Sequence, residues 1–230
     1  GLTVDITYEG SATAPTAAGS YAVVATINDA NYEGSASDTL VIAKAFATVA
    51  LDNLAQTYDG TAKSVTATTT PSGLTVDITY EGSATAPTAA GSYDVVATIN
   101  DANYEGSASD TLVIAKASAT VELGDLAQTY DGTAKSVTAT TTPSGLTLDI
   151  TYNGSATAPT EAGSYAVVAT VDDANYEGSA SDMLVIAKAQ QTISFPAIGN
   201  KLDVDTVVLS ATASSGLDVN FTMLSGPATI

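Results

Sequence analysis

The chain has 230 residues, of which 25 are acidic and only 6 are basic, so its formal net charge is −19. The sequence contains no His, Cys, Trp or Arg, which excludes a zinc site of the usual kind, a thiol nucleophile and a His general base. The negative charge also opposes binding to the phosphates of a nucleic acid. Composition therefore favours a structural or binding role, and the sequence predicts no catalytic, cofactor-binding or metal-binding residues.

Hydrophobic residues make up 45% of the chain and the mean hydropathy is +0.19, which indicates a folded protein. The longest uncharged apolar stretches, such as residues 21–27, are far shorter than the about 20 residues that span a bilayer, so we expect no membrane insertion here. No signal peptide or anchor is recognisable in the sequence. The absence of Cys has two interpretations. It is either chance in a low-complexity composition or, taken with the repeats described below, a sign of a secreted repeat protein, because free thiols oxidise outside the cell.

A repeat of 72 residues organises the chain. GLTVDITY begins at Gly1 and again at Gly73, and GLTLDITY begins at Gly145. Residues 1–44 and 73–116 differ at one position only, where Ala22 corresponds to Asp94. Near-identical tandem copies are difficult to reconcile with a single active site and favour an array of modules.

Four domains follow from this repeat. We expect a partial repeat at 1–44, complete repeats at 45–116 and 117–189, and a partial domain of different sequence at 190–230. Acidity belongs to the module, because 45–116 carries 8 acidic residues and 2 Lys, and 117–188 carries 9 acidic residues and 2 Lys. Short junctions between modules predict an extended array.

Alternation of apolar and polar residues predicts five strands in the repeat at 45–116. We expect them, in chain order, at 45–51, 62–69, 74–81, 93–99 and 110–115. The inner faces are expected to carry Ala47, Val49, Leu51, Leu74, Val76, Ile78, Tyr80, Tyr93, Val95, Ala97, Ile99, Leu112 and Ile114. Differences between the copies support this assignment of inner and outer faces. The charges gained at Asp94 and Glu122 fall on the outer faces, where they stay hydrated.

Turn residues separate these strands, and no segment shows a sustained helical period. Asp59-Gly60 and Asp131-Gly132 favour positive φ angles, and the segments at 71–73, 87–91 and 103–106 mark further turns. Five strands without a helix predict an all-β fold of tandem small immunoglobulin-like β-sandwich modules. The alternative is a β-grasp-like module with a short helix or turn at 52–56.

The two ends differ from the complete repeats. Residues 1–44 lack the first two strands of a module, and 190–230 contain three candidate strands at 192–195, 206–213 and 217–224. Three strands make a poor independent core. We therefore expect either a fragment of a longer chain, or completion of an open sheet edge by strands of a partner chain.

Three motifs carry a family resemblance. The elements YDGTAK, APT-x-AG-[ST]-Y and DANYEG, within residues 1–189, resemble the MBG ("mostly beta, glycine-rich") repeats of bacterial surface and adhesin proteins. Residues 190–230, with QTISFPAI, LSATASSGL and SGPATI, resemble the start of a bacterial Ig-like domain. The resemblance implies an extracellular stalk or spacer and transfers no catalytic residue.

Several residues remain candidates for chemistry. Oxygen ligands for Ca²⁺ recur at Asn100, Asp101 and Asn103, although such a loop can equally cap its own backbone. Calcium is therefore possible and no other cofactor is expected. An internal isopeptide bond would use Lys63 or Lys116 with Asn103. The alternative interpretation is that each lysine is solvated at the end of a strand.

Carboxylates and tyrosines complete these candidates. The pairs Asp77 with Glu81 and Asp172 with Asp173 suit a glycosidase only if a cleft surrounds them, and a solvated face is the simpler interpretation. The recurring tyrosines suit either ligand binding or packing; Tyr80 and Tyr93 are expected in the core, while Tyr104 lies in a loop and Tyr58 recurs as Tyr130.

The sequence as a whole predicts a structural stalk or spacer array of an extracellular bacterial surface protein, with no catalysis. Its expected partners are neighbouring modules of the same chain, and neither nucleic acid nor membrane. Two alternatives stay open: a filament subunit assembled with identical chains by strand exchange, and an adhesive module that binds a glycan or protein.

Overall fold

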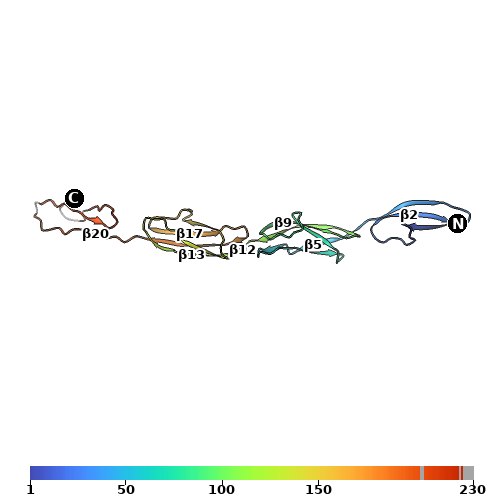
Figure 1. The fold of residues 1–230 in the computed structure, drawn as a ribbon, viewed down its shortest axis with the longest axis horizontal. Coiled ribbons are helices and arrows are strands. Elements are labelled where there is room, and N and C mark those ends of the chain that lie inside the picture. Colours follow the sequence, from blue (N-terminus) through green and yellow to red (C-terminus); the bar gives the residue numbers. More distant parts are fainter. Residues whose placement is uncertain (203–204, 223, 225–230) are drawn as a thin grey trace. The chain divides into compact units, whose positions relative to one another are not determined.

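The computed structural model describes residues 1–202, 205–222 and 224, which form strands, turns and loops without a helix (Figure 1). Contacts divide the chain into two compact units. The first unit contains Gly1–Ala119 and Val171–Gly178, and the second contains Thr120–Thr170 and Ser179–Ile230. The predicted all-β fold is confirmed, and no described helix is long and apolar enough to cross a membrane.

The first unit begins with a three-stranded antiparallel sheet of order β1-β2-β3, formed by β1 (Thr3–Tyr8), β2 (Gly19–Asn28) and β3 (Ser35–Ile42). Its register pairs Val4 with Ile27. Val4 and Ile6 are each 48% exposed, because no second sheet covers this face among the described residues.

A sandwich follows in the same unit. Its larger sheet has the order β6-β11-β9-β8, formed by β6 (Ala55–Thr57), β11 (Ser107–Ala115), β9 (Gly91–Ile99) and β8 (Val76–Tyr80). Strand β6 runs parallel to β11, and the other pairs are antiparallel. The smaller sheet pairs β5 (Thr48–Asp52) with β7 (Thr66–Thr70), and β5 contacts β11 and β9.

This arrangement resembles a reduced immunoglobulin sandwich. The antiparallel strands β8, β9 and β11 correspond to the C, F and G strands, and the second sheet is reduced to the β5–β7 pair. The predicted small β-sandwich is confirmed. The helix of the β-grasp alternative at 52–56 is wrong, because Asn53 adopts a left-handed φ of 64° and turns the chain out of β5 into β6.

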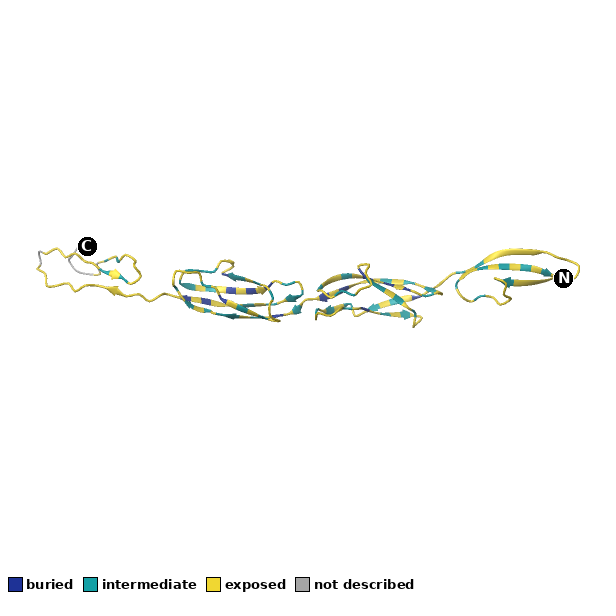
Figure 2. Cartoon of the chain, in the orientation of Figure 1, coloured by how far each residue is buried: buried dark blue, intermediate teal, exposed yellow. Residues whose placement is uncertain are grey.

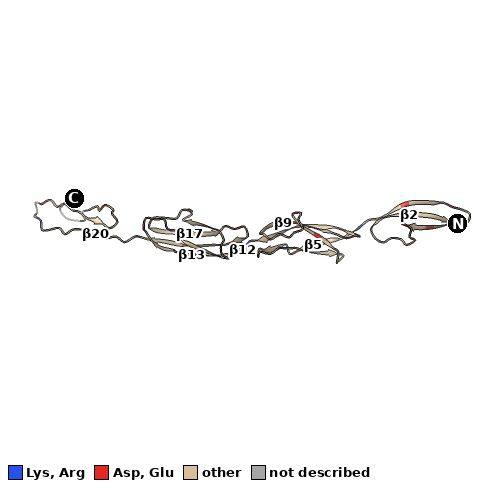
Figure 3. Cartoon of the chain, in the orientation of Figure 1, with Lys and Arg blue, Asp and Glu red and all other residues tan. Residues whose placement is uncertain are grey.

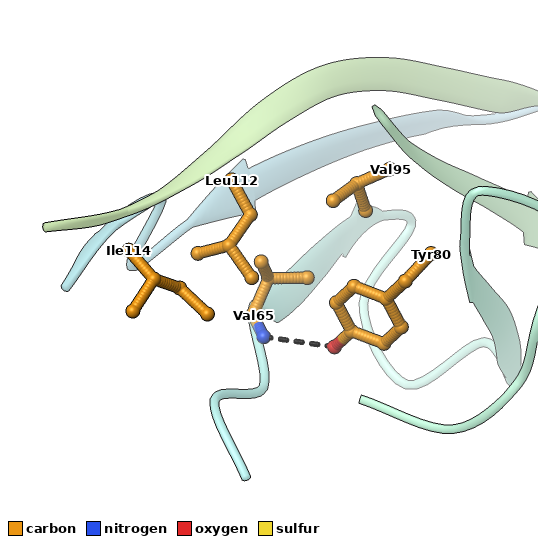
Figure 4. Close-up of a cluster of buried hydrophobic side chains, with 5 residues drawn as sticks. All are labelled: Val65, Tyr80, Val95, Leu112 and Ile114. Carbon is orange, nitrogen blue, oxygen red and sulfur yellow. Dashed lines mark hydrogen bonds between the residues drawn. The ribbon is translucent and has the colours of Figure 1, made fainter. Parts of the chain in front are cut away.

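The core of this sandwich comes from the larger sheet and from the segment before β7, and Leu51 of β5 packs against it from the smaller sheet. Its buried residues are Val65, Tyr80, Val95, Leu112 and Ile114 (Figure 4). Along β9 and β11 buried and exposed residues alternate, as the striping in Figure 2 shows. The predicted inner faces are therefore confirmed, because all the residues expected on them, from Ala47 to Ile114, are buried or half-buried, and the neighbouring Asp94 and Thr98 are exposed.

The second unit repeats the sandwich. Strand β13 (Thr120–Gly124) pairs with β15 (Thr138–Thr142). The larger sheet has the order β14-β19-β17-β16, formed by β14 (Ala127–Thr129), β19 (Ser179–Ala187), β17 (Gly163–Val171) and β16 (Leu148–Tyr152). Its core residues are the equivalents of the first set: Val137, Tyr152, Val167, Leu184 and Ile186.

Two pairs of very short parallel strands lie within the first unit. Strand β4 (Ala45–Phe46) pairs with β10 (Tyr104–Glu105), and β12 (Ala117–Ser118) pairs with β18 (Tyr176–Glu177). The strand expected at 45–51 is thus divided between β4 and β5. Pairing of two residues is too short to leave a periodic pattern in the sequence.

Other strand boundaries also differ from the prediction. The strand expected at 62–69 covers only Thr66–Thr70, and the one expected at 110–115 begins three residues earlier, at Ser107. The segment before Thr66 instead contributes Val65 to the core, with its backbone N–H bonded to the Tyr80 hydroxyl.

The C-terminal part of the second unit has little strand. Strand β20 (Ile193–Ser194) pairs antiparallel with β21 (Thr212–Ala213), and the rings of Phe195 and Phe221 lie 5.9 Å apart. The candidate strand at 206–213 was therefore too long. The one at 217–224 is wrong for 217–222 and 224, which are not strand, and residue 223 lies outside the described residues.

Candidate functional site

Hydrogen bonds between side chains and the backbone organise the loop between β9 and β11 and its equivalent after β17. Asp101 Oδ1 accepts hydrogen bonds from the backbone N–H groups of Asn103 (2.7 Å) and Tyr104 (3.0 Å). Asp173 Oδ1 accepts the equivalent pair from Asn175 and Tyr176. These are Asx turns, in which a side chain caps its own backbone. We call residues 29–33, 101–105 and 173–177 the junction loops.

Two of the junction loops, 101–105 and 173–177, also contact the preceding repeat, within the first unit. Asn103 Oδ1 accepts a 2.8 Å bond from the backbone N–H of Ala18, and Asn175 Oδ1 accepts one of the same length from Ala90. Each bond joins residues 85 positions apart. Asparagine in these loops therefore serves as an acceptor that joins consecutive repeats of the sequence.

Lysine adds a second link to the same loops. Lys44 Nζ donates to the carbonyl oxygen of Asp101, and Lys116 Nζ donates to that of Asp173, both over 2.6 Å. Because the acceptors are backbone carbonyls, these lysines leave the Asp carboxylates free to cap the loop. The recurring lysine is thus a loop-docking residue.

An aromatic contact completes the junction around the 173–177 loop. The ring of Tyr176 meets Tyr58 edge to face, with centroids 5.4 Å apart and an interplanar angle of 82°. Such pairs contribute about 0.5–1.5 kcal/mol beyond the area they bury. Tyr176 is the equivalent of Tyr104 in the next repeat. The tyrosine that recurs at positions 104 and 176 therefore packs, at 176, against Tyr58 of the preceding repeat.

The calcium candidates are engaged in this local bonding. Asn100 Nδ2 donates to Asp77 Oδ2 at 2.9 Å, and Asp101 and Asn103 have the partners given above. Among the described residues no group of three or more acidic side chains has the arrangement of a metal site. Calcium binding stays a prediction for experiment.

The isopeptide candidates each have another partner in the described structure. Lys63 Nζ forms an ion pair with Asp59 Oδ2 at 2.5 Å, and its side chain is only 11% exposed. Lys116 and Asn103 have the docking partners described above, and neither lysine contacts Asn103 in the described bonds. The interpretation of Lys63 as a solvated lysine is wrong, because its ammonium is committed to Asp59.

This ion pair recurs in the second unit between Lys135 and Asp131. The hydrogen bond from Lys63 holds the pKa of the Asp59 carboxyl well below its usual range, and the hydroxyl and backbone N–H of Thr61 act in the same direction. The same cause lowers the pKa of Asp131. Both carboxylates lie on the surface, so the pair fixes a turn more than it adds stability.

The carboxylate pairs proposed for glycoside hydrolysis lie on exposed positions. Asp77 and Glu81 are exposed, and Asp172 is exposed beside the half-buried Asp173. Acidic residues occur throughout the sequence and are not confined to one patch (Figure 3). The structure places none of these pairs in a described cavity.

The tyrosines expected in the core are confirmed there. Tyr80 is 5% exposed, and its hydroxyl accepts a 3.0 Å bond from the N–H of Val65. Tyr93 packs against the same cluster and donates its hydroxyl to the carbonyl of Ala89. Tyr104 is half-buried in β10, and a ligand role for it stays a prediction.

Sequence reasoning missed the junction contacts. The DANYEG motif was visible at a fixed spacing, which indicated a loop of common structure. Its partners Ala18 and Ala90 offer a backbone N–H, which carries no side-chain signature. Only the folded chain identifies them.

The repeated topology of the two sandwiches defines the chain as an array of tandem immunoglobulin-like β modules. The chain belongs to the MBG domain family, whose model matches residues 1–46, 47–118 and 119–190. The likeness of 190–230 to a bacterial Ig-like domain and the domain boundaries predicted from the repeat stay predictions.

One solved structure similar to the chain is that of Sidekick-1 immunoglobulin domains 1–5. It is 11% identical, with a TM-score of 0.34, over 86% of this chain and 56% of that chain, so this chain spans little more than half of its length. No curated protein matches the chain.

Proposed function

We propose that the chain is a structural stalk or spacer array of an extracellular bacterial surface protein, without catalysis. The observation that carries the proposal is the repetition of the same interior. The bond from Val65 N–H to Tyr80 and the bond from Val137 N–H to Tyr152 both measure 3.0 Å, in sandwiches of the same topology. A spacer gains length from identical modules, whereas an active site needs one unique constellation.

Surface chemistry supports an extracellular location. The strand faces and loops carry Asp, Glu, Thr and Ser, and the core needs neither disulfide nor metal, because its side chains are apolar or internally bonded. Like charge on every module discourages association between arrays. Membership of the MBG family supports the same location.

Small-angle X-ray scattering on a length series tests the spacer. Chains with one or two further copies of 45–116 inserted after residue 116 are compared with the original. A stalk predicts a constant increase in maximum dimension with each copy. A maximum dimension that stays constant while the radius of the cross-section rises would show collapse and contradict the proposal.

The filament alternative has one observation in its favour. The inner face of β1–β3 is open, with Val4 and Ile6 each 48% exposed, whereas the equivalent Val76 and Ile78 are half-buried in the complete sandwich. Strands of a second chain could cover that face. Sedimentation tests this alternative: assembly that grows with time and yields fibres in electron micrographs supports it, and a stable monomer contradicts it.

A further inference from the structure

The first and the last strands of the sandwich in the first unit run side by side in the same direction. Strand β4 pairs with β10 at the start of this path, and β6 pairs with β11 at its end, and both pairings are parallel. Between the two pairings β5 crosses to the smaller sheet, where it pairs with β7. Residues 45–57 therefore follow residues 104–115 from one end of the sandwich to the other. We call these two segments the clamp.

Backbone hydrogen bonds of 2.8–2.9 Å join the two segments of the clamp at both of its ends. Each runs from an N–H group to a carbonyl oxygen: Ala45 to Asn103, Ala47 to Glu105, Val113 to Leu54, and Tyr58 to Ala115. The bond from Lys44 Nζ to the carbonyl of Asp101 adds a further link just before the first of them. The first segment is therefore fastened to the last one at its beginning and at its end.

Apolar packing supports the same path. Leu112 and Ile114 of the last strand are buried in the core (Figure 4). Leu51 and Leu54 of the first segment pack against that core. Sliding the first segment along the last one would therefore expose apolar surface to water and break the hydrogen bonds at the same time.

The direction of the clamp decides how it responds to tension. Tension along the chain enters this sandwich at Ala45 and leaves it at Ala115, where the neighbouring repeats are connected. Pulling at these two points draws the parallel segments in opposite directions along their own axis, so that all the bonds between them are loaded together. Strands that are pulled apart from a common end instead lose their bonds one at a time. Forced unfolding depends on the rate of such a rupture.

We propose that the clamp is the force-resisting element of this module, which makes the sandwich resist tension along the chain more strongly than tension in other directions. This inference rests on the proposed stalk function, because a stalk transmits force along its own chain. The same two parallel pairings recur one repeat later, as β12 with β18 and β14 with β19. Resistance to tension is therefore a property of each module.

Gln56 anchors the end of the first segment. Strand β6 lies at the edge of its sheet and pairs with β11 alone. The Nε2 group of Gln56 donates to the carbonyl of Asn53 at 2.9 Å and to that of Ser64 at 3.0 Å, in the segment before β7. This side chain therefore ties a three-residue edge strand to the rest of the sandwich. Gln128 forms the equivalent two bonds in the second unit.

Single-molecule force spectroscopy on the intact 230-residue chain tests the direction of this resistance. The chain has no Cys, so handles attach only at introduced thiols. One variant carries Ala43→Cys and Ser118→Cys, which load the clamp along the chain. The other carries Ala62→Cys and Ser118→Cys, which pull β6 and β11 apart from their common end. All three positions are exposed.

The two directions should differ clearly. At the same loading rate, we expect the unfolding force between positions 43 and 118 to be at least about twofold higher than that between 62 and 118. Equal forces, or a higher force between 62 and 118, overturn the proposal. The scattering series described above tests the stalk separately, so constant increments in length together with equal forces overturn the clamp alone.

A substitution within the clamp provides a second measurement. Gln56→Ala should raise the unfolding rate under a constant load between 43 and 118 by about tenfold, the effect of losing one or two hydrogen bonds. Gln128→Ala is the matched control, because it removes the same two bonds outside the loaded span and should leave the rate unchanged. An unchanged rate with Gln56→Ala, or an equal increase with Gln128→Ala, overturns the clamp.

Discussion

The hydroxyl of Tyr80 accepts a 3.0 Å hydrogen bond from the backbone N–H of Val65, and both residues are 5% exposed. The bond supports a stretch of chain just before β7 that has no strand partner of its own. Figure 4 shows it at the edge of the apolar cluster. Tyr152 and Val137 form the same bond in the second unit.

Tyr80→Phe should destabilise its sandwich by about 1–3 kcal/mol, because the buried N–H of Val65 loses its acceptor. Equilibrium urea unfolding measures the change, and hydrogen exchange at the Val65 amide should accelerate. Tyr8→Phe is the matched control, since Tyr8 has no such bond among the described residues and lies in the open first sheet. Equal effects of the two substitutions would contradict the assignment.

Gly106→Ala should destabilise the junction by about 1–3 kcal/mol, the usual effect of overpacking. A Cβ at Gly106 would overlap the backbone carbonyl oxygen of Ala47, and Gly178 has the same relation to Ala119. At Gly34 the nearest atom is the Cδ1 of Ile27, 3.2 Å away at the end of a flexible side chain. Thermal unfolding should therefore separate Gly106→Ala from the mild Gly34→Ala.

Asn175→Ala should weaken the junction around Ala90 by about 0.5–1.5 kcal/mol, through loss of one hydrogen bond. Hydrogen exchange at the Ala90 amide should become faster, while the core amide of Leu112 keeps its protection. Asn31→Ala provides the comparison, because Asn31 bonds only within its own loop among the described residues. Unchanged exchange at Ala90 would show that Asn175 is not its acceptor in solution.

Lys63→Gln should raise the pKa of Asp59 toward its usual range, since the bond from the lysine is the largest cause of the depression. A depressed pKa means that the ionised carboxylate stabilises the fold above the unfolded-state value of about 3.9, and that this contribution disappears as the pH falls toward the folded-state value. Carboxyl ¹³C titration by NMR measures the shift.

The effect of Lys63→Gln should be confined to one turn. Asp131 keeps its own lysine, Lys135, and should titrate as before, which makes it an internal reference within the same sample. An Asp59 titration that does not move after Lys63→Gln would assign the depression to Thr61 instead. High salt should reduce the effect of the lysine, because the ion pair is exposed to solvent on the aspartate side.

The alternation of apolar and polar residues was sufficient to predict which face of each long strand is buried. Val95, Ala97 and Ile99 alternate with exposed residues along β9, and all three are buried as expected. Alternation works because successive side chains in a strand point to opposite faces. It failed for β6, where Ala55–Thr57 has no apolar alternation and forms a strand only because β11 supplies the partner.

The sequence alone determined the 72-residue repeat, because near-identical segments recur at that interval. It also determined the all-β class, the inner faces of the strands and the outward placement of the acidic residues, because these follow from the alternation of neighbouring residues. Tertiary structure decided which groups meet. The bond from Ala90 to Asn175 spans 85 positions and has a backbone N–H as donor. Such contacts depend on the path of the whole chain, which no local pattern contains.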